Sequence, residues 1–155
     1  MQYPTISEYV KAIQDAGDNL DKSTEATNAE LNEAITDEFG VKYSKDGRKL
    51  LKAPQNLDGT YSVKKGTKII CDMAFYDYSS LSSLVIPDSI TLIGEGAFMN
   101  CYSLKSLIIP DSVTSIGDDA FWFCSSLRNL VIPDSVTAIG DRAFSGCGSL
   151  ERQVV

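Results

Sequence analysis

Cysteines and carboxylates that recur at a fixed spacing are the residues of this chain whose types could support chemistry. Cys101, Cys124 and Cys147 are 23 residues apart, and two sets of acidic residues share that period. Aligned thiols could form disulfides or bind a metal, and stacked carboxylates could bind calcium. The acidic sets are Asp88, Asp111 and Asp134, and Glu95, Asp118 and Asp141, with Asp72 ahead of the second.

Histidine is absent from the chain, and so is any C-x-x-C pair. This absence excludes zinc-finger spacing, catalysis by Ser-His-Asp or Cys-His groups, and acid–base chemistry by imidazole. A free cysteine also packs as a small apolar side chain, and aspartates form turns and cap helices wherever a repeat requires them. We therefore predict no enzymatic activity, no metal site and no cofactor.

The 23-residue period extends well beyond these residues and predicts a solenoid. Four Ala-Phe pairs and three prolines fall on it. One unit cannot bury enough apolar surface to fold alone, whereas stacked units share a core and complete their backbone ladders. The predicted units are 58–80, which is degenerate, then 81–103, 104–126 and 127–149, followed by a partial unit at 150–155.

Each position in the unit 104–126 has an expected structural role. Two short strands should point apolar side chains inward, and Pro110 should end the first strand. Gly117 is expected to allow a sharp corner, and Asp118 to cap a short helical turn. The predicted inward residues are Leu107, Ile109, Val113, Ile116, Ala120, Phe121 and Cys124.

Residues 1–57 lie outside the repeats. Residues 1–40 are predicted to be a helical N-terminal segment, with amphipathic helices over 5–17 and about 27–38 that each begin with a capping-box pattern. Residues 41–57 are predicted to be an N-terminal cap, with a β-hairpin over 41–53 that turns at Asp46-Gly47. The domain boundaries are therefore 1–40, 41–57 and 58–155.

The net charge of −7 is unevenly distributed. Residues 1–40 carry a net charge of −7, residues 41–68 carry +6, and residues 69–155 carry −6. An acidic chain repels nucleic acid, and no apolar stretch is long enough to span a membrane, so neither partner is expected. The basic middle could be an anion site, or it could pack against the acidic helices or face solvent; the last two are expected.

The residues of the repeat resemble a known family. LKSLIIPDSVTSIGDDAFWFC and LRNLVIPDSVTAIGDRAFSGC are similar to the BspA-like (treponemal-type, 23-residue) class of leucine-rich repeats, and the resemblance covers about 41–155. It implies an α/β repeat solenoid, a right-handed array of short parallel strands, and a protein-binding role, commonly adhesion at cell surfaces. The chain departs from the family pattern at Lys64, where a proline is expected, in lacking a secretion signal, and in being a short array without a C-terminal cap.

Two surfaces are candidate binding sites. An apolar stripe, Val85, Ile108 and Val131, is predicted to point outward from the concave strands, although β-branched residues also simply suit strands. Large side chains, Tyr76, Met99 and Trp122 with Phe123 and Tyr102, are predicted on an outer turn. There they could bind a partner, be covered by the N-terminal helices, or be exposed without function.

The most consistent hypothesis is a non-enzymatic protein–protein interaction module, with adhesion as the role that the resemblance implies. The alternative is a structural spacer or targeting part of a longer bacterial multidomain protein. An open C-terminal end also predicts either an end-to-end homodimer or an array that continues in a longer protein. That end would expose Ile139, Phe144 and Leu150 beside an unpaired strand at Val154 and Val155.

Overall fold

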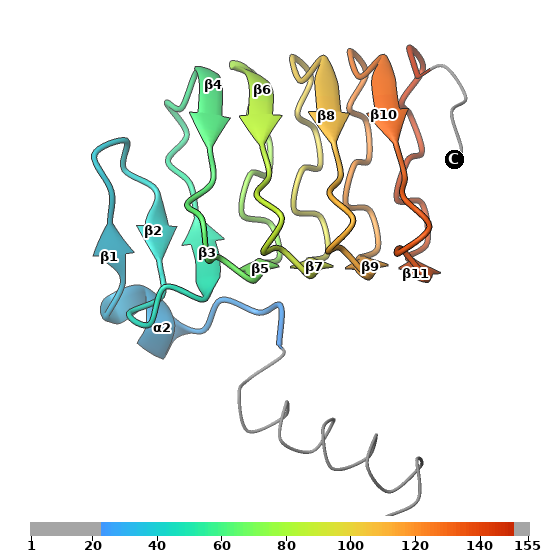
Figure 1. The fold of residues 1–155 in the computed structure, drawn as a ribbon. Coiled ribbons are helices and arrows are strands. Elements are labelled where there is room, and N and C mark those ends of the chain that lie inside the picture. Colours follow the sequence, from blue (N-terminus) through green and yellow to red (C-terminus); the bar gives the residue numbers. More distant parts are fainter. Residues whose placement is uncertain (1–22, 151–155) are drawn as a thin grey trace, which may run out of the picture.

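A computed structural model of the chain describes residues 23–150 (Figure 1). Each coil of the solenoid contributes one short strand to each of two sheets, so the predicted repeat solenoid is confirmed. The predicted helix over 5–17 and the chain beyond residue 150 lie outside the described residues. The elements are α2 (Asn28–Asn32), β1 (Ile35–Thr36), β2 (Lys42–Tyr43), β3 (Lys49–Lys52), β4 (Gly59–Ser62), β5 (Ile69–Ile70), β6 (Leu81–Val85), β7 (Leu92–Ile93), β8 (Ser106–Ile108), β9 (Ser115–Ile116), β10 (Asn129–Val131) and β11 (Ala138–Ile139).

The two sheets run along the solenoid on different faces. One has four parallel strands in the order β10-β8-β6-β4, and the other has seven in the order β1-β2-β3-β5-β7-β9-β11. Equivalent residues pair across the parallel coils, as Leu130 does with Leu107 and Ile139 with Ile116. Because the register advances by one 23-residue unit per strand, a residue type that recurs in the sequence becomes a column on the structure.

The core between the sheets consists of such columns. The inward residues predicted for the unit 104–126 are all buried. Four phenylalanine rings form a continuous stack in which neighbouring centroids lie 5.1 to 5.3 Å apart and the planes are within 10° of parallel. Offset-stacked rings add stability beyond the area that they bury. The stacked residues are Phe75, Phe98, Phe121 and Phe144.

The corner glycines are explained by close approach between coils. A Cβ atom on Gly117 would lie 2.6 Å from the backbone nitrogen of Glu95, and one on Gly140 would lie 2.3 Å from that of Asp118. The expected reason, conformational freedom at a sharp corner, is therefore not the main one. The sequence also suggested that Asp118 caps a helical turn, which is wrong, since the segment forms turns and Asp118 Oδ1 accepts the amide of Asp141 in the next coil at 2.7 Å.

The N-terminal part of the described chain departs from the expected pair of long helices. Thr27 begins α2 with the expected capping box, but the helix ends at Asn32 rather than near residue 38. Ile35 and Thr36 instead form β1, which pairs with β2. Two consecutive β-branched residues favour an extended backbone, and pairing with the hairpin decides the outcome. The hairpin expected around Asp46-Gly47 is present as β2 and β3.

Candidate protein-binding surfaces

The cysteine column is part of the core. Cys101 and Cys124 are buried, no disulfide joins the column, and each thiol donates a hydrogen bond to a backbone carbonyl 26 residues earlier, at 3.0 to 3.1 Å. The neighbouring thiol of Cys101, together with burial, raises the pKa of Cys124 well above its usual range. A reactive cysteine requires a lowered pKa, so the raised pKa of Cys124 opposes formation of a thiolate there, and the burial and carbonyl bonds of the column place it in the core.

The carboxylate columns connect neighbouring coils. Asp72 Oδ1 accepts the amide of Glu95 at 2.8 Å, as Asp118 does for the amide of Asp141. Asp119 forms a two-point ion pair with Arg142 in the next coil, and this pair lowers the pKa of the Asp119 carboxyl. Within residues 23–150, no three acidic or thiol side chains are grouped so that they could hold a metal ion.

The apolar stripe, Val85, Ile108 and Val131, lies on the outer face of the four-stranded sheet. The register pairs Val131 with Ile108 on adjacent strands, and their side chains are 39% and 77% exposed, while Val85 is 51% exposed. A hollow of about 280 Å³ lies between β6 and β8 and is bordered by Val85, Ile108 and the two serines Ser83 and Ser106. The stripe therefore offers exposed apolar side chains beside a recess that could accept one side chain of a partner.

The large side chains predicted on an outer turn also form a column. The amide of Asp77 donates to the Met99 carbonyl, and the amide of Asn100 donates to the Trp122 carbonyl, each at 2.8 Å. These bonds place Tyr76, Met99 and Trp122 in consecutive coils. Tyr76, Tyr102 and Phe123 are exposed, and Met99 and Trp122 are half-buried. We call Tyr76, Met99, Tyr102, Trp122 and Phe123 the aromatic patch.

Phe123 has an unusual backbone conformation within this patch. Its φ is +56°, in the left-handed region that bulky residues rarely adopt. The equivalent positions in the neighbouring coils hold Asp77, Asn100 and Gly146, which are the usual residues for this conformation. The Phe123 ring is 41% exposed, forms an edge contact with Trp122 at 4.2 Å between centroids, and leans over Gly146. Strain on an exposed aromatic residue is a reason to consider it functional.

One of the alternatives for the aromatic patch was cover by the N-terminal helices. For the described residues this is wrong. Ala26, Leu31 and Ala34 pack instead against the seven-stranded sheet. We call residues 23–34, which lie between the start of the described chain and β1, the strap, because they cross the outer face of this sheet at β3 and β5.

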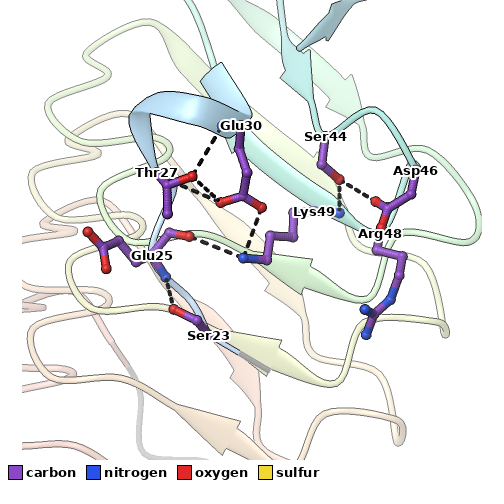
Figure 2. A network of polar contacts seen from close by, with 8 residues as sticks. All are labelled: Ser23, Glu25, Thr27, Glu30, Ser44, Asp46, Arg48 and Lys49. Carbon is purple, nitrogen blue, oxygen red and sulfur yellow. Dashed lines mark hydrogen bonds and ion pairs between the residues drawn. The ribbon is translucent and has the colours of Figure 1, made fainter. Parts of the chain in front are cut away.

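The basic residues behave as the charge pattern predicts. Lys49 is buried and forms an ion pair with Glu30 of α2, with Nζ 3.1 Å from Oε2, and it also donates to the Glu25 carbonyl (Figure 2). Burial opposes ionisation of Glu30, but the Thr27 amide and Lys49 together lower the pKa of Glu30 below its usual value. The lysines 42, 45, 52, 64, 65 and 68 are exposed. The Lys64 ammonium lies 5.1 Å from the centre of the Tyr43 ring.

Sequence reasoning missed the surface that the strap covers, although a signal was present. The outward positions of the seven-stranded sheet read Ile69, Leu92, Ser115 and Ala138 from the first coil to the last. Cys71 also stands where later coils have glycine. Large apolar residues at outward positions in the first coils, and small ones afterwards, indicate that something covers the first coils.

Comparison with known proteins identifies the repeat. A family model described as "BspA type Leucine rich repeat region (6 copies)" matches residues 59–155, more than half of the chain. The chain belongs to the BspA-type leucine-rich repeat family. None of the curated proteins matches it significantly.

Solved structures of several bacterial proteins share this fold. The pneumococcal vaccine antigen PcpA is 30% identical with a TM-score of 0.73, and the match covers 77% of this chain and 30% of PcpA. A leucine rich cell surface protein from Faecalibacterium prausnitzii is 27% identical with a TM-score of 0.62, over 79% of this chain and 39% of that protein. The T. pallidum leucine rich repeat protein, at 23% identity and a TM-score of 0.60, shares the fold over 81% of this chain and 69% of its own.

The BspA-type chain thus spans about a third of the length of the first two of these proteins. Leucine-rich repeat proteins of this kind generally mediate protein–protein interaction, and one of the structural neighbours is described as a cell surface protein. In the described part of the chain, no helix has the length and apolar character needed to cross a membrane.

Proposed function

We propose that this BspA-type solenoid is a non-enzymatic protein-binding module and that it binds its partner through the apolar stripe. The observation that carries the proposal is the exposure of Ile108, which is 77% accessible at the centre of a regular sheet face. β-Branched residues suit strands whether or not they bind anything. A hollow bordered by two of the three stripe residues is not required by strand propensity, and it supports a binding role.

Charges at the two ends of the strands would orient such a partner. Lys105 and Arg128 are exposed and stack through a 2.9 Å backbone bond just before β8 and β10, while Asp111 and Asp134 are exposed after them. The stripe therefore lies between a cationic and an anionic edge. Complementary charges on a partner would fix its direction and speed its association more than they would raise its affinity.

The sharpest test compares two arginine substitutions on opposite sheets. Ile108→Arg places a charge in the stripe, and Thr114→Arg places one on the seven-stranded sheet, in a column where Lys68 already shows that a long cationic side chain fits. Proteins captured by the wild-type chain should be retained by Thr114→Arg and lost with Ile108→Arg, as quantified by mass spectrometry. Equal retention by both variants would exclude the stripe as the binding surface.

The aromatic patch is a second candidate because of the strained backbone at Phe123. Trp122 is the only tryptophan of the chain, so its fluorescence reports directly on this surface. Binding at the patch should shift Trp122 emission to shorter wavelength, and Trp122→Ala should weaken binding while the fold is retained. A partner that binds tightly without changing this emission does not bind at the patch.

A surface or adhesion role extends this proposal, supported by the description of one structural neighbour as a cell surface protein. The alternative role, as a spacer or targeting part of a longer protein, is supported by the fraction of its neighbours that the chain spans. The binding role and the spacer role predict different results for Ile108→Arg, because a spacer would lose no captured protein when Ile108 is replaced.

A further inference from the structure

The outer face of the seven-stranded sheet changes in character beyond the strap. At β3 and β5 the strap covers this face. Its residues Ala26, Leu31 and Ala34 pack, together with Leu92, against the buried cluster of Leu51, Ile69 and Cys71. The next outward positions are Ser115 and Ala138. The face therefore changes from a covered apolar surface to an open one with small side chains, and Figure 1 shows the described strap extending below β3 and β5 while β9 and β11 continue past it.

Among the described residues, an open furrow begins beside Thr24 of the strap. It has a volume of about 380 Å³, and it extends from Thr24 of the strap across three coils. Gly94, Gly117 and Gly140 line it in a row, and a Cβ atom on any of them would point into the preceding coil and not into the furrow. The outward positions that border the furrow, Ser115 and Ala138, carry small side chains, so the strands are not covered by bulky groups here.

The strap itself shows how a peptide binds to this face. Its residues 23–27 have no helical or strand assignment, and the Asp72 amide donates to the Thr24 carbonyl at 2.8 Å. Opposite charges hold it in place, since the acidic strap pairs with the buried Lys49 through Glu30 and the Glu25 carbonyl (Figure 2). The strap is therefore held on this face both by a backbone hydrogen bond and by an ion pair between opposite charges.

The strap lies over a cationic residue, Lys49, whereas the furrow is lined by acidic residues. Asp72, Glu95 and Asp118 line one wall, one per coil, at a spacing of about 4.8 Å. Asp72 and Asp118 each use Oδ1 to accept an amide of the next coil, at 2.8 and 2.7 Å, which fixes both carboxylates along the wall. Like charges held this close repel one another, and a cationic ligand would relieve that repulsion.

We propose that the furrow binds an extended peptide segment of a partner protein that carries lysine or arginine and otherwise small side chains. The segment would continue the path of the strap over β7, β9 and β11, with its backbone beside the small side chains of Ser115 and Ala138 and its cationic groups on the carboxylate wall. About four extended residues, at roughly 3.3 Å each, span the wall from Asp72 to Asp118. This site lies on the opposite sheet from the apolar stripe and is independent of it.

Fluorescence anisotropy of a labelled octapeptide that alternates lysine with alanine tests the proposal with the full chain. We expect saturable binding that weakens as salt is raised, and no binding of the matching peptide with glutamate in place of lysine. Glu95→Lys reverses one charge of the wall, and Ser115→Tyr fills the furrow without changing charge. Each should weaken binding at least tenfold.

Two controls separate the furrow from general attraction to an acidic protein. Asp58→Lys makes the same charge change at an exposed position outside the furrow, and Ser125→Tyr makes the same steric change at an exposed turn, in the column where Tyr102 already shows that a tyrosine fits. Both should leave affinity within about twofold. Equal weakening by Asp58→Lys and Glu95→Lys would overturn the proposal, and so would the absence of saturable binding.

Two other occupants of the furrow give different outcomes. If the basic residues 41–68 of a second copy occupied it, the chain without peptide would self-associate, and Glu95→Lys would abolish that association. If residues 1–22 of the same chain occupied it, the lysine peptide would bind only after their removal. Either result would overturn assignment to a partner segment.

Discussion

Replacing single members of the phenylalanine stack should reveal how stability is distributed along the solenoid. Phe121 is fully buried, and its ring is stacked between Phe98 at 5.1 Å and Phe144 at 5.3 Å. Truncating a buried phenylalanine to alanine costs about 3–5 kcal/mol. Phe144 is only half-buried and has a single stacked neighbour in the described structure, so its loss should cost roughly half as much, about 2 kcal/mol.

Urea unfolding followed by circular dichroism at 25 °C can resolve this difference. With a denaturant slope of about 2 kcal/mol per molar, Phe121→Ala should lower the midpoint by about 2 M and Phe144→Ala by about 1 M. Phe121→Leu, which retains most of the volume, is the matched control and should remain folded if the alanine variant is too unstable to study. A cost for Phe144→Ala equal to that for Phe121→Ala, or a cost for Phe121→Ala below about 2 kcal/mol, would refute the reasoning.

Three further predictions follow from close contacts and buried groups. Gly117→Ala should cost about 1–3 kcal/mol because the added Cβ would lie 2.6 Å from a backbone nitrogen, whereas Gly148→Ala, with open space around it, should be nearly neutral in the same urea assay. Lys49→Met should free the strap and speed hydrogen exchange of the Asp72 amide at least tenfold, as measured by NMR; Lys52→Met, an exposed change on the same strand, should not. The stabilisation that buried thiols and phenols contribute to the free energy of unfolding should be fully present below about pH 8. It should fall at higher pH by up to about 1.4 kcal/mol per pH unit for each titrating group, because the unfolded chain loses protons that the folded chain retains. Urea midpoints between pH 7 and 10.5 test this, and a constant midpoint would contradict it. The thiols and phenols whose pKa the fold raises are Cys124, Cys147, Tyr43, Tyr61 and Tyr78.

The repeat could be predicted in detail because every coil makes the same contacts as its neighbours. A side chain that is buried in one coil, such as Leu107, is buried at the equivalent position of the next, such as Leu130. Period and register were therefore sufficient to place the strands, the core and the apolar stripe. The reasons assigned to individual residues were less reliable, since Asp118 and Gly117 serve contacts between coils that are invisible within one unit.

The N-terminal segment was predicted less well because its structure depends on partners far away in sequence. The capping box at Thr27 was correct, since it rests on local hydrogen bonds. The length of the helix was not, because pairing of Ile35 with Tyr43 ends the helical region and begins a strand. Where the strap lies depends on Lys49 and on the apolar group around Leu51, and neither is distinctive until the coils are stacked.

Departures from the repeat can now be separated by whether the fold explains them. Cys71, Ile69 and Leu92 differ from the later coils, and the strap that covers them accounts for the difference. Ile108 and Phe123 have no such cover among the described residues, and each is unfavourable for a free monomer, the first by exposing apolar surface and the second by a strained backbone. Neighbouring coils have smaller or more flexible residues at these two positions, so the repeat itself does not require Ile108 or Phe123. We therefore propose that binding is the reason for each of them.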